Sequence, residues 1–219
     1  MILSRGRRFL FLHIPKTGGT AFTMAYEARA LKDDILVGDT PKARARKARL
    51  RGLKTAGRLW KHSAFNDLGG ILPEEELAGL FTLTLVRNPW NRVVSYYHWL
   101  RGQTFAHPAV GLAKTHDFSG FLNHPQTRTV LRLWPYGAYV RQPDGVEKPS
   151  LFVRLEAYAD DIQPFENHVG FRLPLRRANA SERGVDWRPY YSDADAGVVG
   201  EDCAADVQRF GYRFDPQTA

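Results

Sequence analysis

The chain has little sulfur and no long apolar run. Among its 219 residues are one cysteine, Cys203, and two methionines. A single thiol cannot form an internal disulfide, which fits a reducing compartment. No stretch approaches eighteen consecutive apolar residues, so the sequence predicts no membrane-spanning helix. The first apolar run is short and stops at Pro15, which disfavours a cleaved signal peptide. We therefore expect a cytoplasmic protein.

Acidic residues are outnumbered, and one segment lacks them altogether. The chain has 31 Lys and Arg against 23 Asp and Glu, a formal net charge of +8. Such a charge attracts nucleotides, acidic sugars, nucleic acids or membrane surfaces, although it can also serve only solubility. Residues 41–62 hold nine Lys or Arg and no acid. This segment suits a basic helix, a loop that orders on an anion, or a solvated face.

The hydrophobic residues suffice for a core of respectable size. They make up 43% of the chain, and we find no internal repeat and no linker. One domain spanning residues 1–219 is therefore the expectation.

Two segments of the chain read as a strand, a turn and a helix. Residues 9–14 and 80–86 are nearly continuous apolar runs, typical of strands buried on both faces of a parallel sheet. Helices are expected at 20–31 and 90–100, the second with Asn88 as its N-cap and Pro89 as its first residue. Polar residues follow the carboxyl end of each strand, where open α/β sheets bind ligands.

Weaker patterns suggest the remaining elements. We expect a short strand at 35–37, helices at 74–80, 118–123 and 157–169, two strands around the Asp144-Gly145 turn, and a last helix from an N-cap at Ser192 to about residue 210. Residues 102–146 have little periodicity, and residues 176–188 read as a polar loop.

The turn after the first strand predicts a site for a phosphate-like group. A helix that starts there leaves its first N–H groups without partners, and its dipole adds positive potential. Lys16 adds a charge, Thr17 and Thr20 add hydroxyls, and Gly18 and Gly19 let an anion approach the backbone. The lysine precedes the glycines, so this is not a Walker A loop. An ordinary tight turn with a surface lysine is the alternative.

The second turn offers another pair of anion ligands. Arg87 stands at the end of the second strand, and Ser95 lies eight residues later in the following helix. A guanidinium fork and a hydroxyl suit a phosphate. A salt bridge for Arg87 and a helix-surface position for Ser95 are the alternatives. Two anion sites at strand ends suit a ligand with two separated anionic groups.

These stretches resemble the sulfotransferases that use 3′-phosphoadenosine 5′-phosphosulfate (PAPS). "HIPKTGGT" is similar to the family's 5′-phosphosulfate loop, and "VRNPWNRVVSYY" to its 3′-phosphate motif. The nearest branch contains bacterial carbohydrate sulfotransferases and the uronyl and heparan sulfate 2-O-sulfotransferases. "KHSAFNDLGGILP", "LFVRLEAYADDIQPF", "RANASE", "WRPYYSD" and "RFGYRF" also resemble segments of that branch. The likeness is weak over residues 102–146 and absent in the basic segment.

The resemblance implies a fold, a co-substrate and a set of binding residues. The fold would be a P-loop-like three-layer α/β fold with a central parallel sheet flanked by helices. PAPS would be consumed and PAP released, with no metal. The 5′-phosphosulfate would be bound by Lys16, Thr17, Gly18, Gly19 and Thr20, and the 3′-phosphate by Arg87 and Ser95. Asn179, Ser181 and Arg183 lie where related enzymes close a loop over the nucleotide, and a polar surface loop is the alternative.

Two residues are the candidates for catalysis. Sulfuryl transfer is an in-line displacement, and Lys16 is suited to neutralise the oxygen that leaves. The acceptor hydroxyl needs a base, for which a histidine is the natural choice near neutral pH. His62 stands where the resembling branch carries its base, although a loop histidine is the alternative. No histidine pair has zinc-ligand spacing.

The expected activity is transfer of a sulfuryl group from PAPS to a hydroxyl, with a neutral or acidic carbohydrate as the acceptor. A small nucleotide kinase with a P-loop-like site is a second hypothesis, disfavoured by the position of Lys16. A nucleic-acid-binding protein that uses the basic segment is a third. A catalytically inactive nucleotide-binding module is a fourth.

Overall fold

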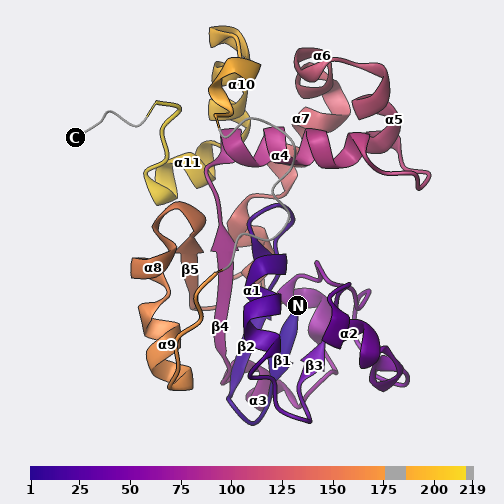
Figure 1. Ribbon diagram of the computed structural model, residues 1–219, viewed down its shortest axis with the longest axis vertical. Coiled ribbons are helices and arrows are strands. Elements are labelled where there is room, and N and C mark those ends of the chain that lie inside the picture. Colours follow the sequence, from indigo (N-terminus) through magenta and orange to yellow (C-terminus); the bar gives the residue numbers. More distant parts are fainter. Residues whose placement is uncertain (176–185, 216–219) are drawn as a thin grey trace. The chain divides into compact units, whose positions relative to one another are not determined.

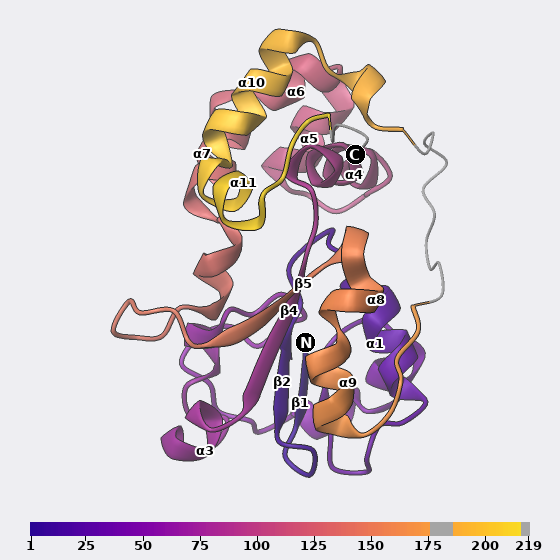
Figure 2. The ribbon, with the colours of Figure 1, turned by 90° about the vertical axis from the view of Figure 1, so that its left-hand side faces the viewer.

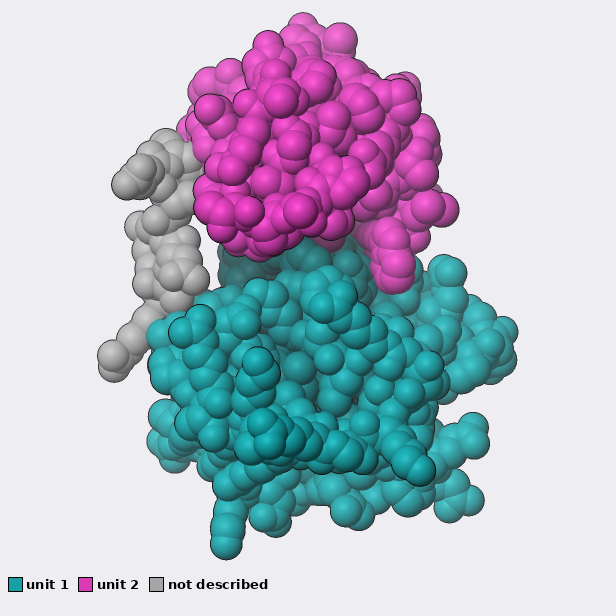
Figure 3. Space-filling model, turned by 90° about the vertical axis from the view of Figure 1, so that its right-hand side faces the viewer, with its two compact units in different colours: residues 1–86, 136–178 teal, residues 87–135, 179–219 magenta. Residues whose placement is uncertain are grey.

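The computed structural model describes residues 1–175 and 186–215, which form an α/β structure. These residues make two compact units, and each unit is built from two separate stretches of the chain. Unit 1 contains Met1–Val86 and Tyr136–Ala178, and unit 2 contains Arg87–Pro135 and Asn179–Ala219. Figure 3 colours the two units. We describe each unit by itself, and the expected single domain stays a prediction.

Unit 1 contains one five-stranded sheet among its described residues, with the strand order β3-β1-β2-β4-β5. The strands are β1 (Ile2–Ser4), β2 (Phe9–Leu12), β3 (Ile35–Leu36), β4 (Phe81–Val86) and β5 (Ser150–Arg154). Strands β2, β4 and β5 are parallel, whereas β1 pairs antiparallel with both β2 and β3. The sheet is therefore mixed, and the expected wholly parallel sheet is not what the structure shows.

The short β1–β2 connection explains why the sheet is mixed. Parallel neighbours need a long crossover, but only residues 5–8 separate these two strands. The backbone N–H of Arg8 donates to the carbonyl of Arg5 at 3.1 Å, which closes a hairpin turn. The sequence analysis did not predict β1.

Both faces of the sheet are buried, as the apolar run in β2 predicts. Phe9 and Phe11 pack on one face, with Phe22 of α1 (Gly19–Glu27) and Phe165 of α9 (Gln163–Val169). Leu10 and Leu12 pack on the other face, with Leu77 of α3 (Glu74–Ala78). Helices therefore cover both faces of the sheet (Figures 1 and 2). The other helical segments of unit 1 are α2 (Pro41–Ala45), η1 (Lys47–Leu50), η2 (Phe65–Leu68), η3 (Tyr136–Val140), η4 (Leu155–Ala157) and α8 (Tyr158–Asp161).

Unit 2 is helical over its described residues. Its elements are α4 (Pro89–Arg101), α5 (Pro108–Thr115), α6 (Phe118–Asn123), α7 (Pro125–Leu133), η5 (Arg188–Tyr190), α10 (Asp193–Asp202) and α11 (Ala204–Phe210). Its core packs side chains of α4, such as Trp90 and Tyr97, against Phe121 of α6 and Val199 of α10. The expected N-caps at Asn88 and Ser192 are confirmed, since each side chain accepts a backbone N–H bond at its helix start.

Candidate functional site

The loop between β2 and α1 has a backbone conformation that is costly for one residue. Lys16 has a φ of 67°, and Gly18 has a φ of 91°. Glycine adopts this left-handed region readily, but a lysine there costs about 1–2 kcal/mol. Strain of this kind is found most often at functional sites, where the rest of the fold holds it in place.

The start of α1 offers the N–H groups that an anion site needs. The helix begins at Gly19, and no side chain caps it. The backbone N–H groups of the first three helical residues therefore have no intrahelical partner, and the helix dipole adds positive potential beside them. Thr17 contributes differently from expectation, because its buried hydroxyl donates to the carbonyl of Ile14 at 2.9 Å. That hydroxyl holds the loop together.

The two glycines of the loop serve different purposes. Gly18 supplies the left-handed backbone. Gly19 is buried, and a Cβ placed on it would lie 2.1 Å from the ring of His13. Gly19 is therefore required because the His13 ring packs directly against the helix start. The sequence suggested only that a glycine would let a ligand approach.

His62 lies beside this loop although it is far from it in the sequence. Its Nδ1 lies 2.6 Å from the carbonyl oxygen of His13, and the two imidazole ring centroids are 4.7 Å apart. A carbonyl can only accept, so Nδ1 carries the hydrogen and donates it. In the neutral ring this leaves the lone pair on Nε2, which is the form that a general base requires.

The electrostatic environment keeps both histidines neutral. Burial is the main cause that lowers the pKa of His62 to about 4. The hydrogen bond to the His13 carbonyl raises this pKa, and the charge of Lys61 lowers it further. Burial is the main cause that holds the pKa of His13 well below its ordinary value of 6.5, and the charges of Lys61 and Lys16 act in the same direction. Lys61 has a carboxylate partner, Asp39, at 2.5 Å. The features at the carboxyl end of β2 that suit an anionic ligand are therefore Lys16 and the uncapped N–H groups of α1.

Arg87 and Ser95 belong to unit 2, where Arg87 immediately precedes the N-cap of α4 and Ser95 lies in the helix itself. Arg87 is half-buried, and its guanidinium donates to the side-chain oxygen of Asn91 at 2.8 Å. Ser95 is 9% exposed, and within the described residues its hydroxyl makes no hydrogen bond. Asn91 lies four residues after Arg87 and four before Ser95, so the three side chains share one side of the helix start. The sequence analysis missed Asn91, although its i, i+4 spacing to both residues was visible.

The remaining candidate features are the expected loop over the nucleotide, a metal site and a membrane-spanning helix. Asn179, Ser181 and Arg183 lie outside the described residues. No cluster of three His, Cys, Asp or Glu side chains able to hold a metal ion occurs in residues 1–175 and 186–215. Over the same ranges, every helix is too short or too polar to cross a membrane.

The structure thus brings Lys16, Thr17, Gly18, Gly19, Thr20 and His62 to one end of β2 in unit 1, and Arg87 and Ser95 to one helix start in unit 2. The described loop presents uncapped N–H groups beside a cation, and a neutral imidazole lies next to it. In comparison with known proteins, no family model matches the chain and no curated protein matches it.

Proposed function

We propose that the protein is a PAPS-dependent sulfotransferase that transfers a sulfuryl group to a hydroxyl, with a carbohydrate as the acceptor. The observation that carries the proposal is the loop from His13 to Thr20. It combines a strained lysine with an uncapped helix start, and beside it lies His62 with its lone pair on Nε2. We also propose that β2, β4, β5 and α1 form a P-loop-like core, to which β1 and β3 add an antiparallel edge.

The residues of the loop fit the charged end of the donor. The N–H groups of Gly19 and Thr20 would bind oxygens of the 5′-phosphosulfate, and Gly18 adds no Cβ at the turn. Lys16 would offset the negative charge that grows on the phosphate oxygen as the sulfur–oxygen bond breaks. PAPS would supply the sulfuryl group, and PAP would leave.

His62 would remove the proton of the acceptor. Its Nδ1–H is fixed by the His13 carbonyl, so Nε2 is the atom that would take the proton as the acceptor oxygen forms its bond to sulfur. A pKa of about 4 keeps the imidazole neutral at pH 7 but makes it a weak base. The negative charge of a bound donor would raise that pKa toward the working range.

Arg87 and Ser95 would bind the 3′-phosphate. A guanidinium presents a fork of N–H donors that matches a phosphate, and the Ser95 hydroxyl is an additional donor. Asn91 would act as a positioning residue that orients Arg87.

Ligand-dependent thermal stability tests the proposal most directly. The full chain is melted with PAP, ATP or ADP in the absence of magnesium. We expect selective stabilisation by PAP, of about 2.7 kcal/mol when its concentration is a hundred times its dissociation constant. Equal stabilisation by ATP would favour the nucleotide kinase instead. No response to any nucleotide, with salt-sensitive binding of nucleic acid, would favour the third hypothesis.

A further inference from the structure

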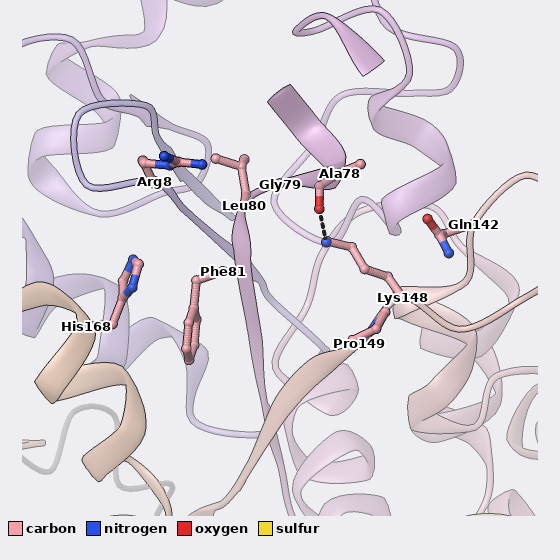
Figure 4. Close-up of a pocket in the computed structure, with 9 residues that line it drawn as sticks. All are labelled: Arg8, Ala78, Gly79, Leu80, Phe81, Gln142, Lys148, Pro149 and His168. Carbon is pink, nitrogen blue, oxygen red and sulfur yellow. Dashed lines mark hydrogen bonds between the residues drawn. The ribbon is translucent and has the colours of Figure 1, made fainter. Parts of the chain in front are cut away.

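A cavity lies in unit 1 at the end of the sheet opposite to the Lys16 loop. Its volume is about 620 Å³, and it is lined by Arg8, Ala78, Gly79, Leu80, Phe81, Gln142, Lys148, Pro149 and His168 (Figure 4). Arg8, Leu80 and Pro149 each immediately precede one of the parallel strands β2, β4 and β5. The cavity is therefore at the amino ends of these strands, whereas the Lys16 loop follows the carboxyl end of β2.

The charge of the cavity is unbalanced. Its lining includes one arginine, one lysine and one histidine, but no aspartate or glutamate. Cavities of about 300–1,000 Å³ are typical of small-molecule sites. The lining thus favours an anionic ligand of metabolite size.

Lys148 is buried without a carboxylate. It is only 7% exposed, and its ammonium donates to the carbonyl of Ala78 at 2.5 Å. The ring of Phe65 lies 5.8 Å from the same ammonium, and over the described residues Lys148 forms no ion pair. Capping the last turn of α3 uses one of its three N–H donors. Burial lowers the pKa of Lys148, which shows that the ammonium is poorly compensated at this place.

Arg8 brings a second cation to the same turn. Its Nη2 lies 3.8 Å from the position of a Cβ built on Gly79, the residue next to Ala78. Within the described chain its guanidinium has no hydrogen-bond or carboxylate partner. The other two arginines of its turn do: Arg5 pairs with Glu76, and Arg7 donates to Tyr26 and the carbonyl of Arg29.

Backbone hydrogen bonds fix the main-chain positions of both residues. The N–H of Phe81 donates to the carbonyl of Arg8 at 2.9 Å, which ties the β1–β2 turn to the start of β4. The N–H of Lys148 donates to the carbonyl of Val140 at the same distance. On another wall, His168 donates from Nε2 to the carbonyl of Arg7 at 2.8 Å and stacks on Phe81. The cavity thus has a rigid frame and an apolar wall.

We propose that this cavity binds the phosphate group of a small metabolite between Arg8 and Lys148. Two cationic side chains match the charge of a phosphate monoester, which is close to −2 at neutral pH, better than that of a carboxylate. Phe81, Leu80 and Pro149 would contact the rest of the ligand. The inference does not depend on the proposed function.

Inorganic phosphate is the probe that tests the site. Amide chemical shifts of the full chain are followed during a phosphate titration at constant ionic strength, with acetate as the comparison. The titration is made in Lys16→Gly as well as in the wild type, so that binding at the α1 loop does not contribute. We expect saturable shifts at Gly79, Leu80 and Phe81 with phosphate, and no saturation with acetate.

Three variants decide the assignment. Arg8→Asn keeps a residue that tolerates the φ of 52° but removes the cation, and should weaken phosphate binding at least about tenfold. Arg51→Asn changes the charge equally at an exposed arginine and should leave binding unchanged. If Lys148→Met folds, its melting temperature should no longer respond to phosphate. Three results would each overturn the proposal: amide shifts that grow linearly with phosphate concentration, phosphate binding in Arg8→Asn as tight as in the wild type, or saturation by acetate at the same residues.

Discussion

At the scale of single residues, Lys16 combines a strained backbone with a positively charged side chain. Its φ of 67° is one that glycine adopts without penalty. The substitution Lys16→Gly should therefore leave the melting temperature unchanged or raise it, because relief of strain offsets the extra entropy of the unfolded chain. The same variant should lose turnover and bind PAPS more weakly, because the cation meets negative charge in the ground state as well.

Replacing His62 should change the kinetics in a different way from replacing Lys16. Asparagine can still donate to the carbonyl of His13, so His62→Asn keeps the local hydrogen bond but removes the base. We expect kcat to fall about 10²–10⁴-fold with little change in nucleotide affinity, measured beside Lys16→Gly with the same acceptor. Near-full activity of a folded His62→Asn would exclude it as the base, and His13 and His98 would be tested next.

Replacing Arg87 should affect only the binding of the 3′-phosphate. Arg87→Ala should weaken binding of PAP by roughly 2–4 kcal/mol if the site is desolvated. Binding of the nucleotide that lacks the 3′-phosphate should hardly change. Asn91→Ala should have a smaller effect in the same direction, because it removes the contact that orients the guanidinium. Calorimetry with both nucleotides measures the difference, and an equal loss for both would contradict the assignment.

The buried histidines also predict how stability depends on pH. In the unfolded chain a histidine binds a proton below about pH 6.5, but His62 in the folded protein does so only near pH 4. The unfolded state thus binds more protons in this window, so the free energy of unfolding falls as the pH drops through it. Urea unfolding at pH 7 and pH 5 should show that His62→Asn loses about 2 kcal/mol less than the wild type. Identical losses would show that His62 is not buried in its neutral form.

At the scale of elements, the junction of β2 and α1 depends on the contact between Gly19 and His13. Gly→Ala near a helix start normally stabilises by up to about 1 kcal/mol. Here the new Cβ would lie 2.1 Å from the His13 ring, so Gly19→Ala should destabilise by about 1–3 kcal/mol. In a His13→Ala background the same substitution should be neutral or stabilising. A double-mutant cycle of unfolding free energies measures the change, and an equal effect in both backgrounds would be evidence against the packing.

The elements also show what the sequence could and could not predict. The strands β2 and β4 and the start of α4 follow from local signals, namely continuous apolar runs and an Asn-Pro cap. The expected last helix is broken at Cys203, between α10 and α11, and no glycine or proline marks that break. Helices α5 and α7 were missed, because the segment around them shows little periodicity in the sequence.

The candidate site was predictable only in part, for the same reason. Lys16 and Gly18 stand in a local motif, so their turn could be read from the sequence. The contact of His62 with His13 spans 49 residues, and the packing of the His13 ring under Gly19 depends on the fold. Pairings of this kind arise from tertiary structure, which no local pattern encodes. The left-handed conformation of Arg8 belongs to the hairpin that the sequence analysis did not predict.

At the scale of the whole molecule, the net charge is +8, and the basic side chains that contribute to it in residues 41–61 fall into two groups. Some cations of residues 41–61 hold the fold: Arg46 donates to the carbonyl of Leu31 at 2.7 Å, and Lys42 donates to the carbonyl of Glu27. Others are exposed, and their side chains form no ion pair or hydrogen bond with the described residues; they are Arg44, Lys47, Arg51 and Lys54. The second group adds positive charge to the protein surface, which attracts anions.

This separation gives a prediction for the proposed enzyme. Replacing Lys47, Arg51 and Lys54 by glutamine should raise the KM of an acidic acceptor and flatten its dependence on salt, because long-range attraction is lost and ionic screening has less to remove. The affinity for PAP and the melting temperature should stay the same, since these side chains support neither the loop nor the core.

A matched triple variant at Lys114, Arg141 and Arg209, which are also exposed, carries the same change in net charge and should keep the wild-type KM. If both triple variants raise KM equally, only the overall charge matters. If the first variant weakens PAP binding instead, the basic segment covers the nucleotide and does not recruit the acceptor.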